Sequence, residues 1–239
     1  MANRLTAIVA GGGIAGLASA VALTQAGWQA TVLERAMAFG EVGAGLGFTS
    51  NGMAALAALG VEEAVRAAGH LAPHAGYQDP HGRWLLRIPE DRDNLGAAMT
   101  ICGVHRQRLH SALRQAAEAA GAELVTGAEV SGLRPGIPGG QPAMVTWRSS
   151  TGEQTRQAAL VVAADGVHST VRAQLFPGVR PSYSGSTSWR AVIPDAVFDG
   201  RLVEVWGPGT EFGAMRVSES EITGTENSAT LTVRHLLAS

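Results

Sequence analysis

Residues 6–16 read Thr-Ala-Ile-Val-Ala-Gly-Gly-Gly-Ile-Ala-Gly, and this stretch decides the fold. Its apolar beginning predicts a buried strand, and the Ala-rich run at residues 14–26 predicts a helix. A second apolar run at residues 31–33 predicts another strand. The order of strand, glycine-rich turn, helix and strand predicts an α/β fold with a parallel sheet.

Three glycines in this turn have the spacing Gly-x-Gly-x-x-Gly. Gly11 permits the tight turn, Gly13 lets a pyrophosphate approach the backbone, and Gly16 lets the helix pack closely on the strand. In a chain with 31 glycines this spacing alone is weak evidence for a nucleotide site. An acidic residue, Glu34, however, follows the second predicted strand. A carboxylate there is suited to accept hydrogen bonds from a ribose hydroxyl. The combination is a Rossmann-like dinucleotide-binding fingerprint; the alternative is a flexible glycine loop beside an incidental surface acid.

Ile14 and Ala15 open the predicted helix. The first N–H groups of a helix lack intrahelical acceptors, and the helix dipole is positive at this end. We therefore expect both residues to contact the phosphates of the dinucleotide.

Three further segments indicate which dinucleotide is bound. Residues 41–48 read Glu-Val-Gly-Ala-Gly-Leu-Gly-Phe, residues 104–109 read Val-His-Arg-Gln-Arg-Leu, and residues 161–172 read Val-Val-Ala-Ala-Asp-Gly-Val-His-Ser-Thr-Val-Arg. In this order the segments resemble the FAD-dependent aromatic hydroxylases, the para-hydroxybenzoate-hydroxylase-like flavoprotein monooxygenases. The resemblance covers about residues 6–213.

The resemblance implies FAD as the resident cofactor and NADH or NADPH as a transient reductant. It implies dioxygen and an aromatic, phenolic small molecule as substrates. It also implies roles for single residues. Arg35 is expected at the adenosine, Gly45 in a loop near the isoalloxazine, Arg106 at the pyrophosphate or ribityl chain, and Asp165 and Gly166 near the pyrophosphate. Without the resemblance, Arg35 is a surface cation, Asp165 a turn residue and Gly45 part of a flexible loop.

The resemblance breaks near the C-terminus. The family has a further Gly-Asp flavin motif, which this chain does not contain, and the polar sequence after Met215 matches no part of the family. We expect a family member shortened at its C-terminus, with a tail from about Ser218 that is mobile or pairs irregularly. Two alternatives to a monooxygenase stay open: a flavin-dependent halogenase or reductase, and a non-catalytic FAD-binding fragment.

Bulk composition narrows the remaining function classes. The chain has 239 residues with 18 Lys and Arg against 20 Asp and Glu, so no basic surplus points to nucleic acid. Cys102 is its single cysteine, which favours a reducing compartment, and we expect a cytoplasmic protein. No apolar run reaches the roughly 18 residues of a membrane span. The seven histidines show no metal-ligand spacing, so no metal is expected. Neither a catalytic base nor the oligomeric state follows from the sequence.

Two interleaved domains are expected. Residues 1–70 and 101–178 would form a discontinuous FAD-binding domain, and residues 71–100 and 179–239 a partial, β-rich substrate domain. Further helices are predicted at residues 51–59, 62–68 and 106–120, strands at residues 123–126, 129–133, 187–193 and 201–206, and a hairpin of residues 143–148 with residues 157–163.

Overall fold

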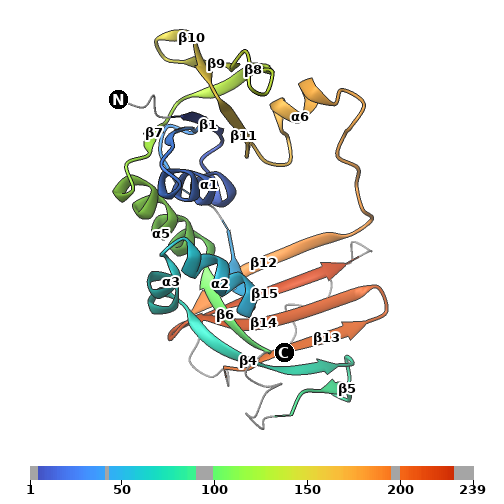
Figure 1. Ribbon diagram of the computed structural model, residues 1–239. Helices are drawn as coiled ribbons and strands as arrows, with labels where there is room; N and C mark the ends of the chain where they lie inside the picture. Colours follow the sequence, from blue (N-terminus) through green and yellow to red (C-terminus); the bar gives the residue numbers. More distant parts are fainter. Residues whose placement is uncertain (1–4, 41–42, 90–98, 195–199, 229–239) are drawn as a thin grey trace. The chain divides into compact units, whose positions relative to one another are not determined.

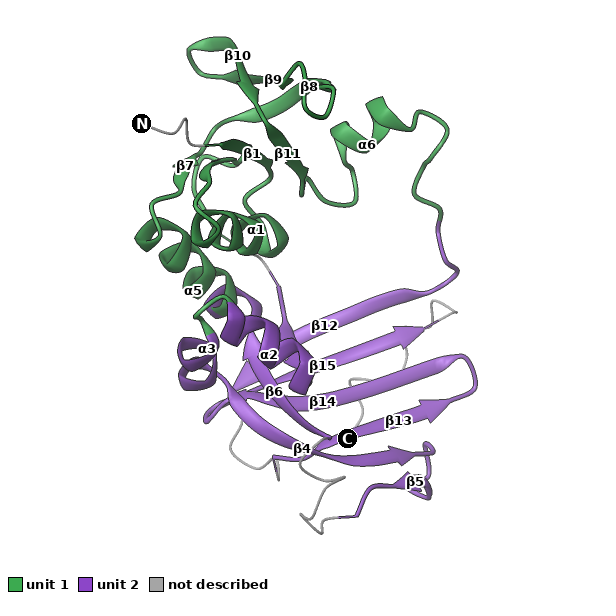
Figure 2. Cartoon of the chain, in the orientation of Figure 1, with its two compact units in different colours: residues 1–41, 59–61, 109–182 green, residues 42–58, 62–108, 183–239 purple. Residues whose placement is uncertain are grey.

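The computed structural model describes residues 5–40, 43–89, 99–194 and 200–228. The chain divides into two compact units that alternate along the sequence (Figure 2). The first unit comprises residues 1–41, 59–61 and 109–182, and the second comprises residues 42–58, 62–108 and 183–239. These units are defined by contacts, so the predicted division into FAD and substrate domains stays a prediction.

The first unit is built on a parallel sheet, as the sequence predicts. Its strands are β1 (Thr6–Ala10), β2 (Gln29–Leu33), β7 (Glu123–Val125) and β11 (Leu160–Ala163), in the spatial order β11-β1-β2-β7. All three pairings are parallel. Helix α1 (Ile14–Gln25) connects β1 to β2 and packs on both strands (Figure 1). The predicted strand–turn–helix–strand unit is therefore confirmed.

A second, antiparallel sheet completes this unit. It consists of β8 (Glu129–Arg134), β9 (Ala143–Ser149) and β10 (Gly152–Ala158), and α6 (Thr170–Leu175) packs on β8. Successive residues of a strand face opposite sides, and β1 uses both. Ile8 and Ala10 join a buried cluster with Val145 and Trp147 of the antiparallel sheet, whereas Val9 faces α1 at Gly16.

The predicted hairpin is wrong in its second strand. Strand β9 pairs with residues 152–158, whereas residues 160–163 form β11 beside β1. The sequence does not reveal β10 as a strand, because its residues are almost all polar and show no apolar alternation. This composition fits the exposure of β10 along almost its whole length. The more apolar run after it belongs to the parallel sheet.

The second unit is built on a mixed sheet of eight strands. The order is β12-β15-β14-β13-β4-β6-β3, with β5 paired to β4. The bounds are β3 (Gly45–Phe48), β4 (His70–Gln78), β5 (Trp84–Arg87), β6 (Thr100–His105), β12 (Thr187–Pro194), β13 (Leu202–Gly207), β14 (Thr210–Ser218) and β15 (Glu221–Ser228). Helices α2 (Ser50–Ala58) and α3 (Glu62–Ala68) contact each other and the β6 side of the sheet (Figure 1). Helix α5 (Arg106–Ala119) begins in this unit and continues in the first.

Two further predictions need correction in this unit. The expected irregular tail is wrong for residues 221–228, because β15 pairs antiparallel with both β12 and β14. The expected loop around Gly45 is wrong from that residue onward, because Gly45 opens β3 and pairs with His105 of β6. β15 has few apolar residues, and two of the four residues of β3 are glycines. Neither sequence therefore shows a strand pattern, and both strands become evident only from their pairing with distant segments.

No helix in the described ranges is long and apolar enough to cross a membrane. Among these residues there is also no group of three or more His, Cys, Asp or Glu side chains that could hold a metal ion.

Candidate functional site

Three chain segments meet where β1, β2 and β11 end. The Gly11 N–H donates to the carbonyl of Leu33 at 2.8 Å, and the Ala164 N–H donates to the carbonyl of Ala10 at 2.8 Å. Residues 11–16, called the glycine loop below, are thereby held next to the segments that follow β2 and β11. In open α/β sheets, ligands bind at this carboxyl edge.

Glycine is required at both ends of the glycine loop. Gly11 has φ +102°, and a Cβ there would lie 2.4 Å from the carbonyl oxygen of Ala164. A Cβ on Gly16 would lie 1.9 Å from the carbonyl oxygen of Gly11. Gly13 is the N-cap of α1 and has an extended backbone. The loop is therefore shaped by close backbone approaches that any larger residue would obstruct.

Glu34 turns its carboxylate toward the glycine loop. Its Oε2 accepts a hydrogen bond from the Gly12 N–H at 2.7 Å, and its Oε1 accepts one from the Ala36 N–H at 2.8 Å. An ionised carboxylate can accept about four hydrogen bonds, so capacity remains for a ribose hydroxyl.

Asp165 lies on the other side of the glycine loop. Its Cα is 3.1 Å from where a Cβ of Gly11 would be, and its Oδ2 accepts from the Val171 N–H at 3.1 Å. Its Oδ1 is buried and has no hydrogen-bond partner in the described part of the chain. A buried carboxylate oxygen without a donor is costly, and a ligand hydroxyl would satisfy it.

The neighbours of Asp165 shape the turn. Gly166 has φ +81°, which favours glycine. Ser169 caps α6 by accepting from the Arg172 N–H at 2.9 Å, and Arg172 in turn donates to the carbonyl of Val167 at 2.5 Å. The Asp-Gly segment is thus a turn between β11 and α6 that these hydrogen bonds hold in place.

The sequence prediction missed two residues of this site. A Cβ on Gly12 would lie 2.5 Å from Phe39 Cε1, so this position also needs glycine, although the fingerprint leaves it free. His110 is 3 % exposed, and its Nε2 lies 2.8 Å from the carbonyl oxygen of Gly12. The available signal was a histidine on the buried side of α5, with Leu113 and Ala117.

Gly45 and Arg106 belong to the second unit, and Arg35 is exposed. A Cβ on Gly45 would lie 2.4 Å from Thr223 Cγ2, so close strand packing requires this glycine. The Arg106 N–H donates to the carbonyl of Ala44 at 3.1 Å, and its side chain passes Gly43. The roles of Gly45, Arg106 and Arg35 toward FAD stay predictions.

The Arg108 side chain is 37 % exposed and has two partners in the second unit. Its guanidinium forms an ion pair with the carboxylate of Glu221 and donates to the carbonyl of Val217 at 3.4 Å. Arg108 therefore anchors β15, which no local sequence pattern indicates. The hydrogen bond from Arg108 to Glu221, more than any other contact, lowers the pKa of the Glu221 carboxyl, and a hydrogen bond from Ser218 adds to the effect.

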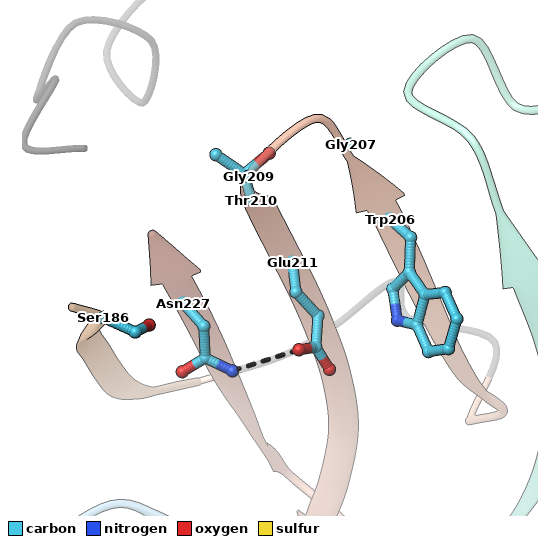
Figure 3. A pocket seen from close by; sticks show the side chains of 7 residues that line it. All are labelled: Ser186, Trp206, Gly207, Gly209, Thr210, Glu211 and Asn227. Carbon is cyan, nitrogen blue, oxygen red and sulfur yellow. Dashed lines mark hydrogen bonds between the residues drawn. The ribbon is translucent and has the colours of Figure 1, made fainter. Parts of the chain in front are cut away.

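The second unit also contains an open cavity of about 330 Å³. It is lined by Ser186, Trp206, Gly207, Gly209, Thr210, Glu211 and Asn227 (Figure 3). The Asn227 amide donates to the Glu211 carboxylate at 3.4 Å, and the Trp206 ring packs on Tyr77 with centroids 4.4 Å apart. Neither Gly45 nor Arg106 lines this cavity, so it is separate from the predicted cofactor contacts of the same unit.

The donor and acceptor set of the first unit fits FAD. The N–H groups at the start of α1 are suited to bind a phosphate. The ionised carboxylates of Glu34 and Asp165, including the buried Asp165 Oδ1, are hydrogen-bond acceptors only. FAD carries a pyrophosphate between two groups with hydroxyls, the ribose and the ribityl chain. Phosphate and hydroxyls therefore both find complementary groups at this sheet edge.

Comparisons with known proteins agree with this fit. The family model described as FAD binding domain matches residues 4–230. The chain is 38 % identical over 223 residues to the aurachin C monooxygenase/isomerase of Stigmatella aurantiaca, covering 92 % of this chain and 56 % of that protein. It is 30 % identical over 220 residues to a 2-heptyl-3-hydroxy-4(1H)-quinolone synthase of Pseudomonas aeruginosa, covering 91 % of this chain and 55 % of that protein.

A solved structure, Klebsiella pneumoniae HpxO complexed with FAD and uric acid, shares the fold with a TM-score of 0.74 at 24 % identity, covering 93 % of this chain and 56 % of that one. The chain thus spans about half the length of the relatives that it matches. The family match runs through β15 to residue 230, beyond the limit of about residue 213 expected from sequence.

These matches confirm the predicted fold class, the predicted cofactor FAD and the resemblance to FAD-dependent aromatic hydroxylases. With its glycine loop, its two carboxylates at the sheet edge and a family match over residues 4–230, this chain belongs to the family of FAD binding domains.

Proposed function

We propose that this chain is the FAD-binding part of a monooxygenase that hydroxylates an aromatic small molecule with NADH or NADPH and dioxygen. The observation that carries the proposal is the meeting of the glycine loop, Glu34 and Asp165 at one sheet edge. The relatives support the reaction class, because one is a monooxygenase and another makes a hydroxylated quinolone.

In this proposal the residues of the first unit hold FAD by its polar parts. Gly13, Ile14, Ala15 and Gly16 bind the pyrophosphate through backbone N–H groups. Gly11, whose N–H donates to the Leu33 carbonyl, shapes the turn and keeps side chains out of the way of the pyrophosphate. FAD supplies the redox chemistry that moves an oxygen atom from dioxygen to the ring, while the protein positions the reactants and excludes water.

The remaining contacts follow the polarity of the ligand. Glu34 accepts a hydrogen bond from the adenosine ribose, and Asp165, beside Gly166, accepts one from a ribityl hydroxyl. Arg35, Gly45 and Arg106 complete the proposed set at the adenosine, the isoalloxazine and the phosphates. Arginine suits the last position because its guanidinium can form two charge-assisted hydrogen bonds to phosphate.

The proposed substrate is a planar aromatic compound with a ring hydroxyl or oxo group. We include 4(1H)-quinolones beside phenolic acids, because a quinolone is the product of one relative. The test is NADH or NADPH consumption by the purified, FAD-loaded chain in the presence of each compound, with product analysis. Consumption stimulated by an aromatic compound, with a hydroxylated product, is the expected result.

Other outcomes separate the alternatives. A chain that binds no FAD contradicts the proposal altogether. Bound FAD with NAD(P)H oxidation that no aromatic compound stimulates favours a reductase, and a halogenated product in the presence of halide favours a halogenase. Bound FAD that NAD(P)H does not reduce favours a non-catalytic FAD-binding role.

A further inference from the structure

The peptide groups around Gly12 are held from two sides. The Gly12 N–H donates to Glu34 Oε2 at 2.7 Å, and the Gly12 carbonyl oxygen lies 2.8 Å from His110 Nε2. A carbonyl oxygen can only accept, so His110 is the donor and carries its proton on Nε2. The glycine loop is thus fixed by one acceptor and one donor that come from distant parts of the sequence.

His110 is rigidly placed for this contact. It is 3 % exposed, its hydrogen bond to Gly12 is buried, and its ring lies 6.3 Å from that of Phe39. Phe39 also closes the space beside Gly12, because a Cβ there would lie 2.5 Å from its Cε1. The Gly12 carbonyl therefore has a fixed direction toward α5.

Because the peptide bond is planar, the direction of the Gly12 carbonyl also fixes the direction of the Gly13 N–H. The carbonyl of Gly12 and the N–H of Gly13 belong to the same trans peptide group, so they point in opposite directions. With its carbonyl bound to His110, this peptide points the Gly13 N–H away from α5. Gly13 is the N-cap of α1, next to the free N–H groups that favour an anion.

We propose that His110 is a positioning residue for the cofactor: by holding the Gly12 carbonyl, it aims the Gly13 N–H at an FAD phosphate oxygen. The inference rests on the proposed binding of the FAD pyrophosphate at the glycine loop. His110 lies outside the dinucleotide-binding fingerprint, yet in this proposal it orients the Gly13 N–H, which belongs to the fingerprint. An unpaired Gly12 carbonyl could rotate and withdraw this donor from the phosphate.

The test compares two side chains of similar length at this position. His110→Gln keeps an N–H donor for the Gly12 carbonyl, whereas His110→Met fills a similar space without one. FAD dissociation constants are measured by quenching of flavin fluorescence, and those of ADP by calorimetry, since ADP carries the pyrophosphate without the flavin. We expect His110→Met to weaken both ligands about five- to tenfold, the effect of one net hydrogen bond, and His110→Gln to stay within about twofold of wild type.

Leu113→Ala is the matched control, because Leu113 is fully buried one turn further along α5. It should lower the urea midpoint of unfolding by more than either His110 variant and still bind FAD normally where the protein is folded. Equal affinities in the Gln and Met variants would overturn the inference, and so would a loss in Leu113→Ala as large as in His110→Met. A wild-type chain that binds neither FAD nor ADP would overturn the proposed function together with the inference.

Discussion

Glu34 has a double task that the fingerprint alone does not reveal. Its two oxygens accept from the Gly12 and Ala36 N–H groups, so it braces the glycine loop before any ribose arrives. We expect Glu34→Ala to weaken FAD binding by about 1–3 kcal/mol, because a charged acceptor is lost to both the loop and the ligand. A fluorescence titration with FAD measures this, and Glu153→Ala, an exposed acid on β10, serves as control. Unchanged affinity in Glu34→Ala would remove this residue from the site.

Arg106 is predicted to contact FAD, although its structural surroundings lie in the second unit. It stands at the start of α5, where a cation opposes the helix dipole, so a role outside the helix is the simplest reason for an arginine there. We expect Arg106→Ala to lower the FAD affinity about tenfold, or about 1.4 kcal/mol, with the fold intact. Flavin content after purification and circular dichroism measure the two effects.

The control for this variant is Arg114→Ala rather than a change at Arg108. Arg114 forms an exposed ion pair with Glu118 one turn apart, which contributes little to stability. Arg108 anchors β15 through Glu221, so its removal would disturb the sheet. Flavin content that is equal in Arg106→Ala and Arg114→Ala would show that Arg106 does not bind the cofactor.

Elements with a strong local pattern were predictable from sequence, and elements defined by distant partners were not. β1, α1 and α3 carry their apolar spacing and their stop signals within a few residues, and the structure gives nearly the predicted bounds. β10 and β15 are polar strands whose hydrogen bonds go to neighbours that a local reading cannot see.

The same distinction holds within the candidate site. Gly11, Gly16 and Glu34 were identified because a known spacing links them. His110 was missed because its partner, the Gly12 carbonyl, lies 98 residues away and is a backbone group. Sequence patterns identify side-chain types, but every residue carries a main-chain carbonyl, so a pattern does not indicate which carbonyl accepts a given hydrogen bond.

A buried threonine of strand β15 forms hydrogen bonds to residues of two other strands, β3 and β12. Thr223 is 3 % exposed; its hydroxyl accepts from the Gly45 N–H at 3.0 Å and donates to the carbonyl of Ala191 at 3.0 Å. Replacing it by valine keeps the shape and removes both hydrogen bonds. We therefore expect Thr223→Val to lower the free energy of unfolding by about 1–3 kcal/mol in urea titrations. Thr225→Val, on the same face of the strand, should change it by less than about 0.5 kcal/mol; equal losses would contradict the assigned role.

Stability of the whole chain is expected to depend on pH in two opposite ways. Burial lowers the pKa of His74 below its usual 6.5, against a smaller effect of Glu204, and hydrogen bonds lower the pKa values of Glu123 and Glu221 below 4.5. Such groups bind fewer protons when folded than when unfolded, so their contribution is lost as the pH falls. Burial raises the pKa values of Cys102 above 9.0 and of Tyr77 above 10.0, so their contribution is lost as the pH rises.

The two directions together predict maximal stability between about pH 6.5 and pH 9, the usual values of His74 and Cys102. Below this window the first loss comes from His74, which is 6 % exposed and whose Nε2 has no hydrogen-bond partner among the described residues. Its protonation would place a charge on a buried ring whose Nε2 has no acceptor among the described residues. Urea unfolding from pH 5 to pH 10 measures the profile. His74→Phe should flatten the decline between pH 6.5 and pH 5, and Cys102→Ala should flatten the decline above pH 9. A wild-type profile that is level from pH 5 to pH 6.5 would show that the folded chain accommodates protonated His74, against the burial seen in β4.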